Sequence, residues 1–324
     1  MKKILLLIMI TLFHNLCFAQ VESLNSKKVV EQFEMFYNQN DYKSIFEMFS
    51  PETQKALPLE KIYEFLSGLN SQAGKINTRK FIKYQKGTFA LYKTEFEKTT
   101  LGLNLSINDN SKINGIFVNA FIDESIPKIE RNITKLQLPF KKEWTVIWGG
   151  DTKELNYHVE SEMQKNAFDI LITDKKGNSY KTNGKSNEDY YAFGKELFAP
   201  CDGEIIKVLD GIVDNKIGEM NSIDVTGNTI IIKTNNNEYL FFCHFKNGTI
   251  KLKEGEKVKQ GQLLGLCGNS GHSSEPHLHF HIQNTKDINS GTGIKCYFEK
   301  LKVNGKLKED YSPIQNDKIS IEKK

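Results

Sequence analysis

The chain has 324 residues, of which 26% are charged and 39% hydrophobic, and its formal net charge is +4. The basic residues are scattered and form no stripe, so this near-neutral balance gives no support for a nucleic-acid partner. A chain of this length is expected to hold two domains, at about 150 residues per domain.

The first nineteen residues have the pattern of an export signal. Lys2 and Lys3 precede an apolar run at residues 4–13, and residues 17 and 19 offer small side chains at positions −3 and −1 for cleavage before Gln20. A membrane anchor is one alternative, but this run is too short to span about 30 Å of hydrocarbon. A lipoprotein site at Cys17 is another. We therefore expect residues 1–19 to be a signal peptide, with export to the periplasm or exterior of a bacterium.

Cleavage after residue 19 would leave 42 basic and 40 acidic residues, a net charge of +2. No later stretch of the sequence is apolar enough to cross a bilayer. We therefore expect no stable membrane insertion once the signal is removed.

Residues 20–125 are expected to form an α+β domain, because apolar residues recur first at helical spacing and then in short β-type runs. The expected helices cover residues 29–37, 42–49 and 59–69, and the expected strands cover residues 81–84, 88–92, 101–107 and 113–122. This layout resembles the cone-shaped nuclear-transport-factor-like fold. The region has no histidine and no cysteine, so we expect no catalytic site there. A small-molecule pocket and a structural or substrate-positioning role both stay open.

A linker at residues 126–143 leads to an expected all-β domain at residues 144–310 and a tail at residues 311–324. The expected β domain consists of short strands joined by tight turns, with strands expected within residues 201–208, 229–233, 239–245, 257–265 and 276–283. Its four cysteines allow three disulfide pairings. Cys243 precedes His244 on an expected strand, so we expect the two side chains on opposite faces and Cys243 in the core.

The strongest local signal is the segment Pro276-His277-Leu278-His279-Phe280-His281. A period of two places its histidines on one face of a strand and the apolar residues on the other. Imidazole binds zinc and also titrates near neutral pH, so neighbouring histidines can hold a metal and move protons. The alternative is a run of surface histidines, or of core histidines with satisfied hydrogen bonds.

Further motifs occur in order over residues 145–285. They are Ala199-Pro200-Cys201-Asp202-Gly203, Gly227-Asn228, Phe242-Cys243-His244-Phe245, Val258-Lys259-Gln260-Gly261-Gln262-Leu263-Leu264-Gly265, Gly268-Asn269-Ser270-Gly271 and Pro276-His277-Leu278-His279-Phe280. Together they resemble the lysostaphin-like (LytM-type) family of zinc endopeptidases, which cut peptide cross-links in bacterial cell walls. The resemblance implies a strand-built groove, one zinc ion per chain, and a peptidoglycan peptide or another extended peptide as substrate.

The resemblance also implies a role for each matching residue. His279 and Asp169 would ligate zinc, and His277 and His244 would be the catalytic histidines beside them. His277 would act as general base, while His244 would bind the developing oxyanion or orient the nucleophile. The chain departs from the family pattern at Lys165, where the family places its first zinc histidine, four residues before the aspartate.

His158 is expected to replace that missing ligand. It lies eleven residues before Asp169 and is the only histidine between the export signal and His244. Two histidines, one aspartate and a water would then give the open tetrahedral site of a catalytic zinc. His272 is expected at the groove edge. For His281 two alternatives stay open, a supporting role behind the metal ligands or no role in the site.

These observations predict a secreted zinc metalloendopeptidase that hydrolyses peptide cross-links of peptidoglycan. The lysine at position 165 motivates one alternative, a degenerate relative that binds wall peptide or activates another hydrolase. A second alternative is a zinc hydrolase on the same scaffold that acts on a peptide from another source. The sequence indicates no oligomeric state.

Overall fold

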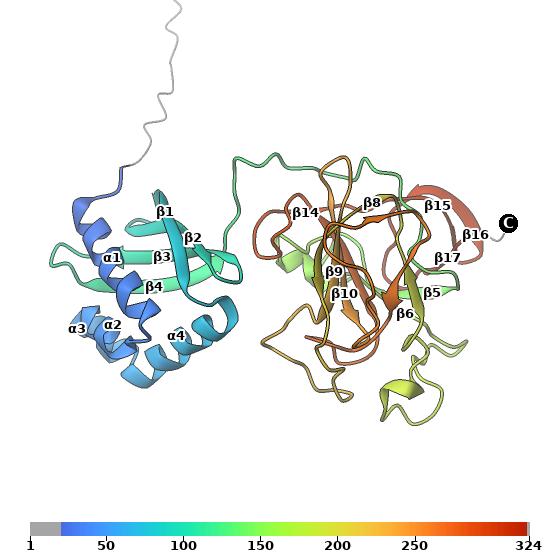
Figure 1. Ribbon diagram of the computed structural model, residues 1–324, viewed down its shortest axis with the longest axis horizontal. Helices are drawn as coiled ribbons and strands as arrows, with labels where there is room; N and C mark the ends of the chain where they lie inside the picture. The colour runs from blue at the N-terminus through green and yellow to red at the C-terminus, as the bar shows by residue number, and fades with distance from the viewer. Residues whose placement is uncertain (1–20, 323–324) are drawn as a thin grey trace, which may run out of the picture.

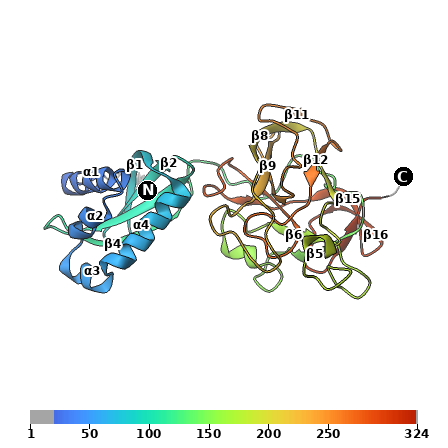
Figure 2. The ribbon, with the colours of Figure 1, turned by 60° about the horizontal axis from the view of Figure 1, so that its bottom comes forward.

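The computed structural model of the chain describes residues 21–322, so the expected export signal lies outside the described residues. Two domains follow one another along the chain and are joined by an extended segment (Figure 1, Figure 2). Within residues 21–322, no helix is both long and apolar enough to cross a membrane.

The N-terminal domain has four helices followed by four strands, as the sequence predicts for an α+β domain. The helices are α1 (Leu24–Asn38), α2 (Tyr42–Met48), α3 (Pro51–Ala56) and α4 (Leu59–Ala73), and the strands are β1 (Ile76–Gln85), β2 (Phe89–Phe96), β3 (Thr100–Ile107) and β4 (Ile113–Ala120). The strands form an antiparallel sheet in the order β1-β2-β3-β4. The helices pack on one face of this sheet, around a core that includes Phe33, Ile45, Leu66 and Tyr92 (Figure 1).

Helix α3 is the one element of this domain that sequence analysis missed. It has six residues, too few for an apolar stripe to repeat. Its beginning still carries a local signal, because the Ser50 side chain accepts a hydrogen bond from the Thr53 backbone and Pro51 occupies the first turn.

The C-terminal domain is all-β, as expected, apart from two short 3-10 turns. Its strands are β5 (Trp144–Trp148), β6 (Phe168–Leu171), β7 (Glu196–Phe198), β8 (Gly203–Leu209), β9 (Asn228–Lys233), β10 (Tyr239–Phe245), β11 (Lys257–Val258), β12 (Leu263–Leu266), β13 (Leu278–Gln283), β14 (Gly293–Ile294), β15 (Phe298–Val303), β16 (Lys306–Tyr311) and β17 (Lys318–Ser320). The 3-10 turns are η1 (Tyr157–Glu160) and η2 (Asn187–Asp189). The run expected at residues 257–265 is divided into β11 and β12 by a turn.

One large sheet dominates this domain, with the strand order β11-β8-β9-β10-β13-β6-β5-β17-β15-β16 and with β14 attached to β13. Strands β10, β13 and β6 lie side by side at its centre and are antiparallel. Along β13 the side chains of Leu278, Phe280 and Ile282 enter the apolar core. The opposite face of β13 therefore presents the polar residues between them.

The segments expected as linker and tail both contact the sheet. Leu136, Leu138 and Phe140, within the expected linker, are buried in the core of the C-terminal domain. Lys318–Ser320, within the expected tail, forms β17 and pairs with β5 and β15. Both segments thus cover part of the C-terminal core.

Candidate metal centre

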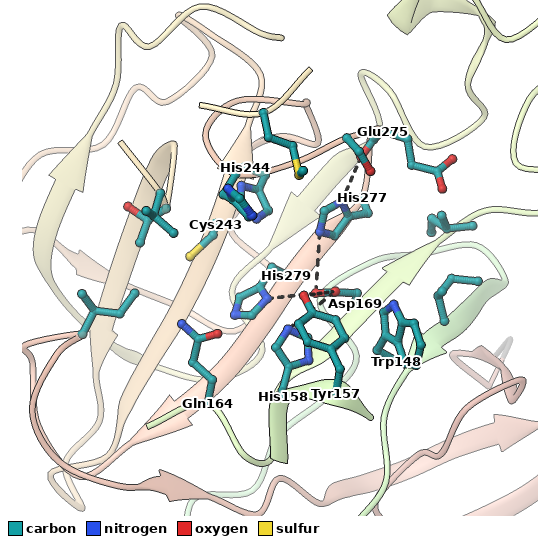
Figure 3. Close-up of a pocket in the computed structure, with 18 residues that line it drawn as sticks. Trp148, Tyr157, His158, Gln164, Asp169, Cys243, His244, Glu275, His277 and His279 are labelled. Atoms are coloured by element: carbon teal, nitrogen blue, oxygen red, sulfur yellow. Dashed lines mark hydrogen bonds and ion pairs between the residues drawn. The ribbon is translucent and has the colours of Figure 1, made fainter. Parts of the chain in front are cut away.

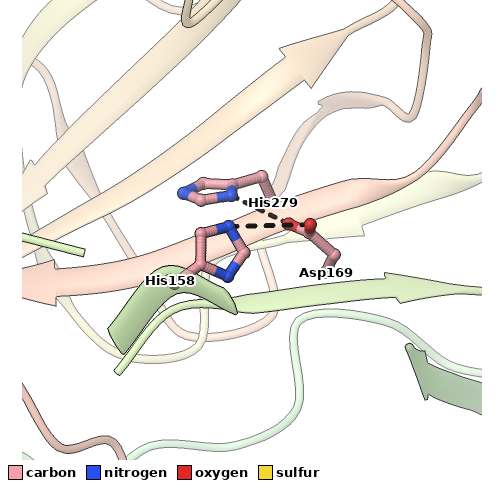
Figure 4. A group of neighbouring side chains, drawn as sticks. All are labelled: His158, Asp169 and His279. Atoms are coloured by element: carbon pink, nitrogen blue, oxygen red, sulfur yellow. Dashed lines mark hydrogen bonds and ion pairs between the residues drawn. The ribbon is translucent and has the colours of Figure 1, made fainter. Parts of the chain in front are cut away.

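Three polar side chains that the sequence predicts as metal ligands converge in the C-terminal domain. His158, Asp169 and His279 each offer a ligand atom, and these atoms all lie within 4.8 Å of one another (Figure 4). All three residues are buried. A His/Asp/His donor set of this kind suits a divalent metal such as zinc.

Asp169 and His279 are placed by the register of the sheet. Asp169 lies on β6 and His279 on β13, and the two residues are direct partners across the antiparallel ladder. His279 Nδ1 lies 2.9 Å from Asp169 Oδ1. Side chains of directly paired residues in a ladder lie on the same face of the sheet. The pairing of β6 with β13 alone therefore brings Asp169 and His279 together.

His158 approaches from the other side, on the turn η1 of an irregular loop. Its Nδ1 lies 2.8 Å from Asn156 Oδ1, while the amide nitrogen of Asn156 donates to the carbonyls of Gly150 and Ala167. Asn156 Oδ1 is therefore an acceptor, and His158 Nδ1 must carry the proton. The unprotonated Nε2 then faces Asp169 Oδ2 at 3.6 Å, as a metal ligand requires.

The ionisation states of this cluster also suit a cation. Burial lowers the pKa of His158 to about 4, so its imidazole is neutral at pH 7. Burial opposes ionisation of Asp169, but the neighbouring histidines, His277 foremost, hold the pKa of its carboxyl well below the usual range. The site thus presents the carboxylate of Asp169 and the neutral imidazole of His158 to a common point.

His277 and His244 lie beside this cluster, as the sequence predicts (Figure 3). Their ring centroids are 4.8 Å apart. His277 Nδ1 lies 2.9 Å from the Glu275 carbonyl and His244 Nδ1 lies 2.7 Å from the Ser270 carbonyl. Since a carbonyl can only accept, both Nδ1 atoms carry protons, and both Nε2 atoms are free to accept a hydrogen bond.

The expected alternation of Cys243 and His244 is wrong. His244 has a φ of 65°, in the left-handed region, and the register of β10 against β9 shifts between Phe242 and Phe245. The period of two ends where the backbone leaves the extended conformation. Both side chains consequently line the same cavity. Cys243 is nevertheless buried, and burial raises the pKa of its thiol to about 12.

The cluster opens into a groove with a volume of about 330 Å³. Its polar lining includes His158, Asp169, His244, His277 and His279, and its apolar lining includes Ile147, Trp148, Leu171, Met220, Val225 and Ile288. A groove lined by both polar groups and apolar walls can hold an extended chain and place one bond beside the histidines.

The other residues considered from the sequence lie as follows. Lys165 binds Glu162 through its ammonium group and is not among the residues that line the groove. His272 lines the groove, as expected for an edge residue. His281 is fully buried and lies behind His279, with His281 Nδ1 at 3.0 Å from His279 Nε2. The cysteines 201, 243, 267 and 296 are buried and free, with no disulfide among them.

Sequence reasoning missed Asn156, Tyr157 and Trp148. The Tyr157 hydroxyl donates to Asp169 Oδ2 over 3.3 Å, and Trp148 packs edge-on against Tyr157. Both aromatic side chains line the groove (Figure 3). The adjacency of Asn156-Tyr157 to His158 was the available signal, because residues that flank a loop ligand are those able to orient it.

Two known protein-family models match parts of the chain. Residues 190–290 match the model of peptidase family M23. The C-terminal domain is an M23 peptidase-family domain. Residues 30–116 match a second model, described as a protein of unknown function (DUF3887), which is consistent with a separate N-terminal domain.

Individual relatives of the M23 domain are distant in sequence. An uncharacterized metalloprotease of Buchnera aphidicola subsp. Baizongia pistaciae is 26% identical over 158 residues, which cover 49% of this chain and 37% of the relative. Peptidoglycan DD-endopeptidase ShyC of Vibrio cholerae is 29% identical over 130 residues, which cover 40% of this chain and 28% of the relative. The chain thus spans about a third of the length of these curated relatives.

Among solved structures, the catalytic domain of the antimicrobial peptidase lysostaphin from Staphylococcus simulans matches with a TM-score of 0.27 and 18% identity. The match covers 47% of this chain and 88% of that domain.

Proposed function

We propose that the chain is a zinc-dependent endopeptidase that hydrolyses peptide cross-links of bacterial peptidoglycan, with one Zn²⁺ per chain held by His158, Asp169 and His279. The convergence of these three donors with two further histidines in the lining of one groove carries the proposal. The M23 assignment of the domain and its similarity to the peptidoglycan DD-endopeptidase ShyC support the substrate class. Such a substrate lies outside the cytoplasm, so the proposal includes export.

A zinc ion at this site would supply Lewis acidity, which polarises a carbonyl and makes a water acidic enough to attack at neutral pH. The M23 domain itself supplies the proton transfers. His277 Nε2 lies 3.6 Å from Asp169 Oδ1, so it reaches the same point as the proposed ligands. With its proton on Nδ1, His277 can accept a proton from the attacking water and then deliver it to the leaving amine.

His244 is suited to orienting the nucleophile. Burial lowers the pKa of His244 well below its usual value, and its single proton is used in the bond to the Ser270 carbonyl. The remaining Nε2 can accept a hydrogen bond but cannot donate one to an oxyanion. Of the two roles expected from the sequence, orientation of the water is therefore the one that this hydrogen bonding supports.

The groove would hold the substrate as an extended segment. The side chains of Trp148, Met220 and Val225 contribute apolar surface to its lining. A groove of this kind accepts a chain with small side chains and fixes the scissile bond by contacts on both sides.

The proposal is tested by incubating the purified full chain with isolated cell walls and measuring both released amino groups and bound zinc. Wild type should carry one zinc and release amino groups, and a chelator should stop the release. His277→Ala should keep its zinc and lose at least about 100-fold in rate, as expected for a general base. Zinc binding without release from walls or from defined peptides would indicate a binding module. Release from defined peptides alone would indicate another substrate.

A further inference from the structure

A chain of hydrogen bonds leads from His279 to the edge of the domain. His279 Nε2 lies 3.0 Å from His281 Nδ1, and His281 Nε2 lies 2.9 Å from Gln283 Oε1. The Gln283 amide nitrogen donates to the carbonyls of Asp287, over 3.3 Å, and Ser290, over 3.2 Å. His281 and Gln283 are both fully buried. We call these two residues the His281–Gln283 relay.

The direction of every bond in the relay follows from its far end. Carbonyl groups only accept, so the amide nitrogen of Gln283 must face them and Oε1 must face His281. His281 then carries its proton on Nε2 and accepts on Nδ1. His279 must in turn donate from Nε2, which leaves Nδ1 unprotonated and directed at the carboxylate of Asp169, 2.9 Å away. Two lone-pair-bearing atoms at this separation repel each other, and a proton or a metal ion between them removes this repulsion.

The far end of the relay lies in the loop of residues 284–292, which contacts the N-terminal domain. The Asp287 carboxylate accepts from the Thr100 backbone over 2.9 Å and from the Thr99 hydroxyl over 3.2 Å. The Asn289 side chain donates to the Thr99 hydroxyl, and the Asn289 carbonyl accepts from the Phe121 backbone. Asp287 therefore binds the relay through its carbonyl and the N-terminal domain through its carboxylate.

We propose that His281 and Gln283 are positioning residues that set the tautomer of the metal ligand His279, and that the N-terminal domain supports them through Asp287. The inference rests on the proposed function, since it takes His279 as a zinc ligand. It gives the N-terminal domain a role in holding the metal site, reached through the 284–292 loop. Phe241, stacked on His281 with ring centroids 4.6 Å apart, fixes the plane of the imidazole.

Paired variants of the full chain separate hydrogen bonding from packing. His281→Phe keeps the stacking on Phe241 but removes both hydrogen bonds, whereas His281→Gln keeps an acceptor for His279 and a donor for Gln283. Zinc affinity, measured by competition with a chromophoric chelator, should fall about 10- to 100-fold in His281→Phe, the range found for groups behind a metal ligand. It should recover most of that loss in His281→Gln. The visible spectrum of bound Co²⁺ should change in the first variant and return in the second.

Asp287→Ala tests the contact with the N-terminal domain without altering the buried relay. It should weaken zinc binding several-fold, and saturating zinc should restore the full rate of hydrolysis. Asp202→Ala is the matched control, because this carboxylate is exposed and pairs only within the M23 domain, with Lys259 and Gln260. Thermal unfolding of each zinc-free variant shows whether it folds.

The outcomes distinguish this inference from the proposed function. Unchanged zinc affinity in folded His281→Phe and Asp287→Ala would overturn the inference and leave the peptidase proposal intact. A rate defect of Asp287→Ala that persists at saturating zinc would also overturn it, because Ile288 of the same loop lines the groove and would then act on substrate. Weakened zinc binding in a chain that hydrolyses no peptide would support the relay and refute the peptidase. A wild-type chain without zinc would overturn both.

Discussion

The two sides of the candidate metal centre are built in different ways. Asp169 and His279 come from neighbouring strands at the centre of the sheet and face each other across the ladder. His158 comes from a short 3-10 turn in an irregular loop and is held by the side chain of Asn156. We refer to these as the strand side and the loop side of the site.

The difference shows what each kind of ligand needs from its surroundings. On the strand side, backbone hydrogen bonds of the ladder fix the position of the residue, and the relay behind His279 has only to set its tautomer. On the loop side, Asn156 both fixes the position of the ligand and sets its tautomer. Its amide nitrogen donates to the Gly150 and Ala167 carbonyls, and its oxygen accepts from His158. A strand ligand therefore depends on topology, and a loop ligand depends on one side chain.

The largest effect is expected from removing one ligand on either side. His279→Ala and His158→Ala should each weaken zinc binding by more than about 100-fold, the upper range for losing a supporting group alone. Metal content of the purified chains, measured against wild type, tests this expectation. One zinc per chain in His158→Ala would show that another group completes the site and that the loop side is dispensable.

Asn156→Ala should have the next largest effect, in the same range as His281→Phe behind the strand side. It frees His158 Nδ1 and removes the side-chain donor of the buried Ala167 carbonyl and of the partly buried Gly150 carbonyl, so zinc affinity should fall about 10- to 100-fold. Asn166→Ala is the control, since Asn166 lies in the same loop and binds the Gly293 carbonyl instead. Equal zinc affinities for the two variants would contradict the role assigned to Asn156.

The loop side should also give the zinc-free protein a pH dependence. Burial lowers the pKa of His158 to about 4, whereas the unfolded chain has the ordinary value of about 6.5. Between these values the unfolded state binds more protons, so the free energy of unfolding should fall as pH drops from 6.5 to 4, by about 3 kcal/mol from this residue. Urea unfolding of wild type and His158→Gln at pH 7, 5.5 and 4.5 measures it. The same slope in both proteins would rule out His158 as its source.

The smallest effect concerns the thiol beside the strand side. Burial raises the pKa of Cys243 to about 12, and Cys243 pairs with His279 across β10 and β13. Chelation of zinc should loosen the loop side and leave Cys243 unreactive, because the ladder remains. Labelling with a thiol reagent at pH 8 should therefore be slow with and without chelator and complete after unfolding. Rapid labelling on chelation would show that the strand side also depends on the metal.

The placement of His279 on one face of its strand could be predicted from a local pattern, whereas Asp169 and His158 were expected from the family resemblance. The alternation Leu278, Phe280 against His279, His281 is a period-two pattern, and a sheet converts this period directly into two faces. The order of helices and strands in the N-terminal domain followed equally from periodicity. Strand β10 was expected at the residues where it occurs, because β-forming residues fill it between clear turn signals.

The contacts that sequence reasoning missed depend on tertiary structure. Gln283 is a supporting residue only because the chain turns back at Asp287 to present a carbonyl, and Asp287 is fixed by Thr99 from the other domain. No local pattern records a contact between residues so far apart. The conformation of His244 likewise follows from its neighbours, since Gly268 donates to its carbonyl and its own N–H donates to Thr226.

That conformation of His244 bears on how sequence change acts on this domain. A left-handed backbone costs a residue with a side chain roughly 1–2 kcal/mol, and glycine has no such cost. With φ at 65°, the backbone of His244 has a conformation that glycine would adopt at a lower free-energy cost. Variants chosen only for thermal stability would tend to lose this histidine first. The most stable form of the fold and the form with a complete set of histidines are consequently different sequences.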